Sequence, residues 1–237
     1  MTSVVPQAHL ERDQRRRDAL VILLAINSGA IDALGFLALG GAFTSVMTGN
    51  MVLLGLSAAH HDGSAAAHSG LAIVFFIVGC ALGTRLAGTA QKGQPPWPRS
   101  VSRSFAVQLA LTLVFAIGWW AKGSHPSGDF ALGLLMINSL ALGTQSTTVQ
   151  RFGVSGLSTT YLTGTLTTMV QRLASGHRMR DVRHNALLLG GLVGGAALGG
   201  TLALHAAWLA PVLPLVCVGT VVLGGVLLMS ESDREIS

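Results

Sequence analysis

The ten residues from Gly41 to Asn50 read GAFTSVMTGN, and a similar stretch, GLSTTYLTGT, returns from Gly156 to Thr165, 115 residues later. Glycine or threonine recurs at four matched positions, so that Gly41, Thr44, Thr48 and Gly49 correspond to Gly156, Thr159, Thr163 and Gly164. We call these stretches the first and second T-G segments. Both are hydroxyl-rich and bracketed by glycine in an otherwise apolar chain, which indicates two related halves that each contain one interrupted segment.

The composition is that of a membrane protein. Half of the 237 residues are hydrophobic and 11% are charged, whereas about a quarter of the residues in soluble domains are charged. The formal net charge of +5 is typical of an inner-membrane protein with basic cytoplasmic loops, so no nucleic-acid partner is expected. Cys80 and Cys217 lie inside apolar runs and are interpreted as core residues. No metal or other cofactor is expected, and the lipid bilayer is the expected partner.

Eight apolar runs follow one another along the chain. They cover residues 19–40, 43–58, 70–87, 104–121, 130–150, 157–171, 185–205 and 209–229. A helix needs about 20 residues to cross the hydrocarbon layer, and the second and sixth runs, which contain the T-G segments, are the shortest. We therefore predict an all-α polytopic membrane protein with about six transmembrane crossings plus two short re-entrant or interrupted helices. The alternative is that these two runs are surface-lying amphipathic helices or short tilted spans.

The positions of the basic residues favour six crossings over eight, because cytoplasmic loops accumulate Lys and Arg. With eight crossings, ten of the fifteen Lys and Arg residues would be cytoplasmic; with six, fourteen would be, and only Lys122 would lie outside. This arrangement predicts a basic cytoplasmic tail at 1–18, a single membrane domain at 19–229 and a cytoplasmic tail at 230–237. The protein is accordingly expected in the bacterial cytoplasmic (inner) membrane.

The two halves resemble each other beyond the T-G segments. The stretch from His68, HSGLAIVFFIVGCALGTRLA, matches HNALLLGGLVGGAALGGTLA from His184 at an offset of 116 residues. The tripeptide INS at 26–28 recurs at 137–139 with an offset of 111, which implies about four extra residues near Gln150 in the second half. Helices rich in Leu, Gly and Ala also match one another by composition alone. With three crossings each, the two repeats would be inverted, as in many secondary transporters; they would cover residues 19–121 and 130–229.

The thirty glycines include several pairs spaced four residues apart, such as Gly79 with Gly83 and Gly195 with Gly199. Small residues at this spacing let helices approach closely in a bilayer, where close packing drives association. We interpret these glycines as helix-packing positions within the chain. The same glycine-rich faces could instead join two copies of the chain in a homodimer.

Asp32 is an acidic residue deep inside the first apolar run. At 1.5 Å per residue it lies on the order of 18 Å beyond Leu20, near the centre of a core about 30 Å thick. A carboxyl group there costs on the order of 3 kcal/mol and must face protein or water. Asn27 and Ser28 extend the same polar stripe. Asp32 is thus either functional or a protonated residue that hydrogen-bonds a backbone carbonyl as structural glue; in the second half, Gly143 occupies the matched position.

These observations predict a substrate site between the two halves. The T-G segments would meet near the membrane midplane, where Gly49 and Gly164 permit the turn and Thr48 and Thr163 supply hydroxyl groups. Asp32 would be the main charge, which favours a neutral or cationic solute over an anion. The predicted site residues are Asn27, Ser28, Asp32, Thr44, Ser45, Thr48, Gly49, Asn50, Asn138, Thr159, Thr160, Thr163, Gly164 and Thr165.

A family resemblance rests on four features in order: Asp32, GFLALGG at 35–41, MTGN at 47–50 and RFGVSGLSTTYLTGT at 151–165. In these features the chain resembles the bacterial YoaK-like integral membrane proteins, a family catalogued as a domain of unknown function. The resemblance covers nearly the whole chain and implies a multi-pass protein of the bacterial inner membrane. It implies no substrate, activity or catalytic residue.

The function that this pattern favours is transport of a small neutral or cationic solute or ion. The alternative is a structural or regulatory membrane protein whose polar stripes only bind helices together. A membrane-embedded enzyme is third, because Asp32 has no partner base, metal-ligand set or nucleophile in the sequence. The protein is therefore not expected to be an enzyme.

Overall fold

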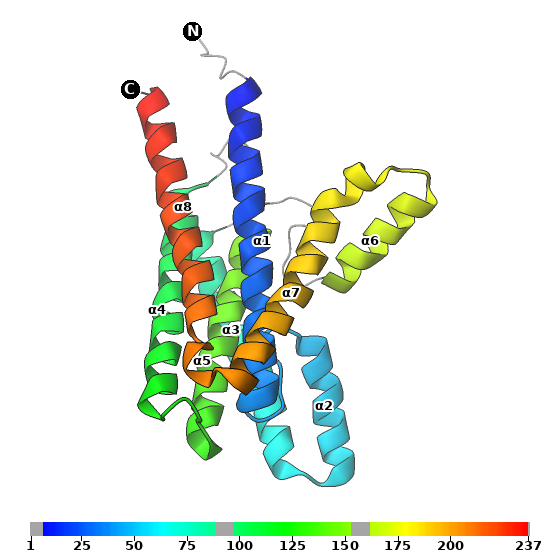
Figure 1. Ribbon diagram of the computed structural model, residues 1–237, viewed down its shortest axis with the longest axis vertical. Coiled ribbons are helices and arrows are strands. Elements are labelled where there is room, and N and C mark those ends of the chain that lie inside the picture. Colours follow the sequence, from blue (N-terminus) through cyan, green and yellow to red (C-terminus); the bar gives the residue numbers. More distant parts are fainter. Residues whose placement is uncertain (1–6, 89–96, 153–161, 237) are drawn as a thin grey trace.

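The structure is a computed structural model that describes residues 7–88, 97–152 and 162–236 (Figure 1). The regular elements in these ranges are all helices, which confirms the predicted all-α class. In chain order they are α1 (Gln7–Ala38), α2 (Met47–His60), α3 (Gly63–Ala87), α4 (Arg99–Ala121), α5 (Gly128–Gln150), α6 (Leu162–Ala174), the 3-10 turn η1 (Met179–Val182), α7 (Arg183–His205), the 3-10 turn η2 (Ala207–Leu209) and α8 (Val212–Ile236).

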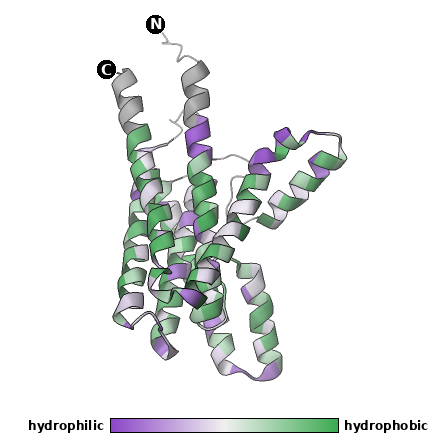
Figure 2. Cartoon of the chain, in the orientation of Figure 1, coloured by the Kyte–Doolittle hydropathy of each residue, from purple (hydrophilic) through white to green (hydrophobic). Residues whose placement is uncertain are grey.

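Five helical segments in the described part of the chain are long and apolar enough to cross a membrane. The chain is therefore a membrane protein with several spanning helices. Figure 2 shows apolar residues along these helices and hydrophilic residues near the α2–α3 turn and in η1. The five candidates are Gln14–Ala38 in α1, Gly63–Ala87 in α3, Arg99–Ala121 in α4, Met179–His205 in η1 and α7, and Ala207–Leu228 in η2 and α8.

Helix α5 has the same 23-residue length as α4 but is not one of these five candidates. Its C-terminal half contains several Thr, Ser and Gln side chains, and most residues between Asn138 and Val149 are buried. It packs on α3 and α4 and also contacts α1. Neighbouring helices thus take the place of lipid around α5, which tolerates polar residues that a lipid-facing helix would exclude.

Helices α2 and α6 contain the helical parts of the two T-G segments. They have 14 and 13 residues, or about 21 and 20 Å at 1.5 Å per residue, which is less than a hydrocarbon core of about 30 Å. Helix α2 packs on α3, and α6 packs on α7. In Figure 1, α2 runs toward the end of the molecule opposite the chain termini, whereas α6 runs toward the end where the termini lie.

Glycines make the closest helix contacts, as the sequence predicted. On α3, a Cβ added at Gly79 would lie 2.2 Å from the carbonyl oxygen of Leu140 in α5. On α7, a Cβ added at Gly195 would lie 2.1 Å from the carbonyl oxygen of Ile26 in α1. Only glycine permits such backbone approach, so these residues pack helices within one chain. Gly190 has no atom within 4 Å of its Cβ position, and the predicted homodimer stays a prediction.

The terminal helices continue into both predicted tails, whose cytoplasmic location stays a prediction. Helix α1 already begins at Gln7, and α8 continues to Ile236, so most residues expected in the tails at 1–18 and 230–237 extend the terminal helices. Arg, Glu and Gln are good helix formers, and a helix started in the apolar run continues through them. Both termini lie at the same end of the molecule in Figure 1.

The interior has two apolar clusters separated by a polar layer. One cluster includes Leu24, Phe105 and Val149, and the other includes Leu34 and Phe115. The buried polar residues of the same helices fall between these positions along the chain: Asn27 and Ser28 on α1, Gln108 and Thr112 on α4, and Asn138 to Ser146 on α5. The candidate site is therefore positioned by α1, α4 and α5.

Candidate functional site

Asp32 is the centre of a set of hydrogen bonds from the loop between α1 and α2. Its Oδ1 atom accepts hydrogen bonds from the backbone N–H of Thr44 (2.7 Å), the Thr44 hydroxyl (2.9 Å) and the backbone N–H of Ser45 (2.7 Å). Its Oδ2 atom accepts one from the Ser45 hydroxyl at 2.5 Å. The two backbone N–H groups donate to the carboxyl group, and the two hydroxyls, which can donate or accept, complete its hydrogen bonds. None of these contacts joins Asp32 to a backbone carbonyl, the partner that the structural alternative predicted.

Two glycines at the end of α1 turn the loop back toward Asp32. Gly40 and Gly41 have φ values of +103° and +78°, a region that favours glycine because it has no Cβ. Gly35 then leaves room for the returning loop, since a Cβ there would lie 2.8 Å from the carbonyl oxygen of Ala42. The turn was expected at Gly49, but this residue lies in the first turn of α2. The chain reverses direction at Gly40 and Gly41, where φ is positive, so no turn is needed at Gly49.

Asn50 holds the other side of the same loop. Its Oδ1 accepts a hydrogen bond from the backbone N–H of Phe43 at 2.9 Å, and its Nδ2 donates one to the Phe43 carbonyl at 2.6 Å. The side chain of Asn50 therefore substitutes for backbone pairing that the loop lacks. We call Asp32, Thr44, Ser45 and Asn50, with the loop 39–46, the loop clamp. Four of the predicted site residues thus lie together, where they bind the loop.

The other predicted site residues of the T-G segments that the structure describes lie outside the loop clamp. Thr48 is exposed on α2, and Gly49 is half-buried beside the ring of Phe43. In the second segment, Thr163 and Gly164 are exposed on α6, where Gly164 has no atom near its Cβ position and is not at a turn, and Thr165 is buried. Two further predicted residues, Thr159 and Thr160, lie outside the described residues.

Asp32 lies in the C-terminal half of the segment of α1 that could cross a membrane. This segment begins at Gln14 and ends at Ala38, so Asp32 lies six residues, or about 9 Å, before its end. Asn27 and Ser28 lie closer to the middle of the same segment, so the polar side chains nearest its middle are neutral. The depth of Asp32 in a bilayer stays a prediction.

Gln145 of α5 organises these neutral groups into a second cluster. Its Oε1 accepts hydrogen bonds from Asn27 Nδ2 at 2.9 Å and from Gln108 Nε2 at 2.6 Å. Its Nε2 donates to Ser28 Oγ at 2.9 Å and to the Leu24 carbonyl at 3.2 Å. One side chain therefore joins α1, α4 and α5 in the interior. We call Asn27, Ser28, Gln108 and Gln145 the amide cluster.

The amide cluster and its neighbours retain unpaired polar atoms. Asn27 Oδ1 and Gln108 Oε1 are buried without a hydrogen-bond partner, as are both side-chain polar atoms of Asn138 and the hydroxyl of Ser139. All four residues have 0% exposure. Buried polar groups in native proteins are almost always paired with protein or water. This region is therefore suited to hold water or a polar solute.

Sequence reasoning found part of this region and missed part of it. Asn27, Ser28 and Asn138 were predicted site residues, and the structure places the first two in the amide cluster. Gln108 was not predicted, although a Gln in the apolar run 104–121 is the kind of intramembrane polar residue that marks a site. Gln145 was not among the predicted site residues either. The hydrogen bond between Gln108 and Gln145 could not be predicted from the sequence, because the two residues are 37 positions apart on different helices.

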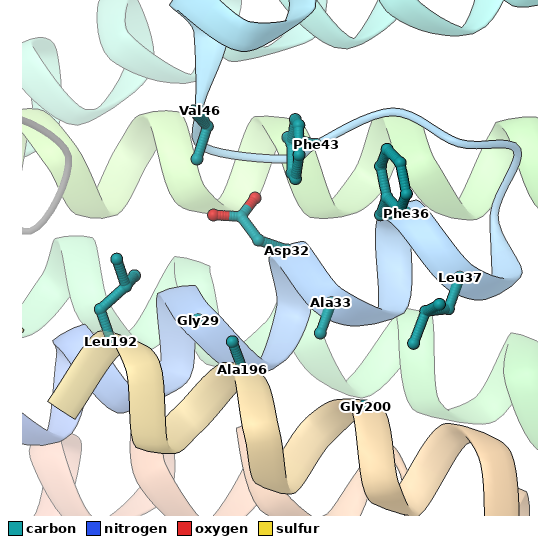
Figure 3. Close-up of a pocket in the computed structure, with 10 residues that line it drawn as sticks. All are labelled: Gly29, Asp32, Ala33, Phe36, Leu37, Phe43, Val46, Leu192, Ala196 and Gly200. Carbon is teal, nitrogen blue, oxygen red and sulfur yellow. The ribbon is translucent and has the colours of Figure 1, made fainter. Parts of the chain in front are cut away.

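A cavity of about 340 Å³ lies beside the loop clamp, between α1, the loop and α7 (Figure 3). Asp32 is the charged residue on its wall. The other lining residues are apolar or small: Gly29, Ala33, Phe36, Leu37, Phe43, Val46, Leu192, Ala196 and Gly200. The cavity therefore combines one acidic group with a predominantly hydrophobic wall.

Comparison with known proteins places the chain among membrane proteins without a known activity. Residues 20–224 match the family model described as "Protein of unknown function (DUF1275)". The chain is similar to the UPF0700 transmembrane protein YoaK of Bacillus subtilis (strain 168), with 32% identity over 158 residues, which cover 67% of this chain and 68% of that protein. No solved structure matches the chain.

Proposed function

We propose that this chain, which belongs to the DUF1275 family of proteins of unknown function, transports a small neutral or cationic solute or ion across the bacterial cytoplasmic membrane. The observation that carries this proposal is the non-helical loop 39–46, which folds back along α1 to the level of Asp32. Non-helical backbone at membrane depth is tolerated where protein surrounds it or it lines a cavity. Transporters commonly build their binding sites on such interrupted helices.

The proposed topology has six crossings, with α5 as the sixth beside the five apolar candidates. Both termini lie at one end of the molecule in Figure 1, which agrees with an even number of crossings. The six-crossing arrangement puts fourteen of the fifteen Lys and Arg residues on one side, and such a bias identifies the cytoplasmic side. Helix α2 and the loop before it would then form a re-entrant unit that enters and leaves on the opposite side.

An inverted repeat is the second part of the proposed architecture. The helix pairs support it, since α1 packs on α7 as α5 packs on α3, and α1 contacts α8 as α5 contacts α4. The short helices follow the same rule, because α2 packs on α3 and α6 on α7. Their opposite directions in Figure 1 are those expected for two re-entrant units related by an axis in the membrane plane. The single membrane domain would still comprise 19–229.

The chemistry of the interior supports the proposed substrate class. The amide cluster and Asn138 offer neutral hydrogen-bonding atoms, several of them unpaired, and the nearby charge is the carboxylate of Asp32. An anion near Asp32 would meet repulsion in a medium that screens charge weakly. A neutral or cationic solute meets no such barrier. Since Asp32 binds the loop rather than a nucleophile or base, we further propose that the protein is not an enzyme.

A structural or regulatory role is the second candidate, and the loop clamp favours it. Within the part of the chain that the structure describes, each hydrogen bond of the Asp32 side chain comes from Thr44 or Ser45. The clamp can therefore stabilise the fold without any solute. The two candidates differ in what they require of Asn138. Its unpaired, fully buried amide is expected to contact a transported solute, but a purely structural protein does not need it.

Untargeted metabolite analysis of a deletion strain tests the proposal. We compare cells that lack the protein with cells complemented by the natural chain, by Asn138→Leu or by Gly190→Leu, which changes an open position on α7. Transport predicts a metabolite whose cellular level is restored by the natural chain and by Gly190→Leu but not by Asn138→Leu. Equal metabolite profiles in all four strains, with equal membrane insertion of the proteins, would contradict transport.

Cysteine labelling tests the topology separately. Residues engineered in 59–69 and 122–129 are expected to react with an impermeant reagent from outside the cell. Cysteines introduced at 172–183 are expected to react only after the membrane is permeabilised. Labelling of 172–183 from outside would exclude the six-crossing arrangement, and the inverted repeat with it.

A further inference from the structure

We propose that the cavity beside the loop clamp binds an organic cation with an apolar body, whose ammonium group pairs with Asp32. This inference deepens the proposed transport function by naming the substrate class. The cavity has a volume of about 340 Å³ and is bounded by α1, the loop 39–46 and α7 (Figure 3). Its size suits a small amine with a ring or a short branched chain.

The charge of Asp32 is the first step of the argument. Its four hydrogen-bond donors are neutral backbone and hydroxyl groups. Among the residues that the structure describes, no Lys, Arg or His forms an ion pair with it. A buried charge with no counter-ion is unfavourable in a low-dielectric interior. A cationic ligand would supply the missing charge.

The carboxylate still has room for such a ligand. Asp32 Oδ1 accepts three hydrogen bonds from the loop, but Oδ2 accepts only the one from the Ser45 hydroxyl. A carboxylate oxygen can accept about two hydrogen bonds. In Figure 3 the carboxyl group lies between Val46 and Leu192, among the residues that line the cavity. An ammonium group in the cavity could therefore bind Oδ2 without displacing the loop.

The residues that line the cavity favour an organic cation over an inorganic one. Phe36 and Phe43 stack with their ring centroids 5.0 Å apart, and both line the cavity. Aromatic faces attract ammonium groups and also contact apolar groups. Ca²⁺ needs six to eight oxygen ligands, and Mg²⁺ about six, but the polar lining side chain is that of Asp32. A cation with its own hydrocarbon surface replaces those ligands by apolar contact.

The cavity is reached from the lipid-facing side of the bundle. Phe36 and Leu37 have exposures of 45% and 49% within the candidate span of α1, so this wall faces the bilayer. Asp32 lies about 9 Å before the end of that span, which is deeper than a lipid headgroup. We therefore assign the site to a free amphipathic cation that enters from the bilayer, and not to a lipid ammonium group.

Equilibrium binding to the purified full-length protein in detergent tests the assignment. The probe is radiolabelled benzyldimethylammonium, which has one N–H to donate to Oδ2, and its control is isobutylbenzene, which has the same shape with carbon in place of the charged nitrogen. Saturable binding of benzyldimethylammonium, at least about tenfold tighter than that of isobutylbenzene, is expected from the charge pair. Equal affinity of the two probes, or no saturable binding of the cation, would overturn the proposal.

Two variants separate the charge from the cavity. Asp32→Asn removes the charge and keeps acceptors for the loop donors, and it should weaken cation binding about tenfold or more. Gly200→Leu fills the cavity from α7, where a Cβ at Gly200 would be 3.5 Å from Leu37 Cδ1, and should weaken both probes. Gly190→Leu makes the same change outside the cavity and should leave binding unaltered. Unchanged cation binding in folded Asp32→Asn protein would contradict the assignment.

The outcomes distinguish this site from the transport function. A protein that binds the cation as expected but restores no metabolite in the deletion strain would contradict transport and keep the site. A protein that restores a neutral metabolite equally well with Asp32→Asn, and binds no cation, would contradict the site and keep transport. Displacement of the probe by phosphatidylethanolamine, but not by phosphatidylglycerol, would assign the cavity to a lipid and overturn the proposal.

Discussion

The loop clamp and the amide cluster each contain buried polar residues of α1, but their partners come from different parts of the chain. Asp32 binds residues only 12 and 13 positions away, and each donor that it holds belongs to one short loop. Gln145 binds Asn27 and Gln108, which are 118 and 37 positions away on two other helices. The clamp therefore holds the shape of one segment, whereas the amide cluster holds three helices together.

The two regions also differ in what they leave unpaired. In the loop clamp, Thr44, Ser45 and Asn50 all have hydrogen-bond partners. In and around the amide cluster, oxygens of Asn27 and Gln108 and the amide of Asn138 have none. Where every polar atom is paired, a substitution leaves a buried partner without its hydrogen bond and lowers stability. Where polar atoms are unpaired, a bound solute can supply the hydrogen bonds that are absent. The clamp is thus the more sensitive region for stability, and the amide cluster is the more sensitive one for solute binding.

The largest loss of stability is expected for Asp32→Leu. The substitution leaves four buried donors without an acceptor, and each such group costs about 1–3 kcal/mol. We expect a decrease of at least about 4 kcal/mol in the free energy of unfolding, measured by thermal or denaturant unfolding in detergent. Asp32→Asn should lose less than half as much, because its oxygen still accepts from the loop and the Ser45 hydroxyl can reverse. Equal stability of the two variants would show that the clamp does not hold the loop.

Gln145→Leu is expected to have a smaller effect. It removes four hydrogen bonds that join three helices, and hydrogen bonds between membrane helices contribute about 0.6 kcal/mol each on average. We expect a loss of about 2 kcal/mol in the same unfolding measurement. A loss as large as that of Asp32→Leu would remove the contrast between the two clusters.

Gln108→Leu should be nearly neutral for stability, with a loss below about 1 kcal/mol. The substitution removes one hydrogen bond to Gln145 but also removes an oxygen that is already buried without a partner. A double-mutant cycle with Gln145→Leu measures the pair, and a coupling of about 0.5 kcal/mol or more is expected for residues in one network. Additive effects would mean that Gln108 does not belong to the amide cluster.

The smallest effect is expected for Thr48→Val. Thr48 is exposed on α2, so the change should alter stability by less than about 0.5 kcal/mol. Thr44→Val is the matched comparison in the same T-G segment, because it removes the hydroxyl bond to Asp32 and should cost about 1–2 kcal/mol. If Thr48→Val proves as destabilising as Thr44→Val, the two threonines share a structural role. A loss of transport without a loss of stability would make Thr48 a solute contact.

The T-G segments show how far reasoning from the sequence reached. It predicted that this stretch interrupts a helix and lies near Asp32, because glycine and hydroxyl residues in an apolar run favour a break in the helix. It assigned the turn to Gly49, but the left-handed backbone lies at Gly40 and Gly41. Which glycine of several makes a turn depends on where α1 stops and on the contact of Gly35 with the returning loop. Neither the end of α1 nor this contact can be predicted from the composition of the segment.

The sequence by itself determined the membrane class, the helical fold and the location of the short polar segments. These properties follow from sums over neighbouring residues, since hydropathy, length and charge act locally on insertion into a bilayer. Only the tertiary structure decided the partner of each buried polar group and the place of Gln108 beside Gln145. A helix sequence defines which side chains share a face, but its rotation and depth against another helix are decided by backbone contacts such as those at Gly79 and Gly195. Residues far apart in the chain supply both sides of those contacts.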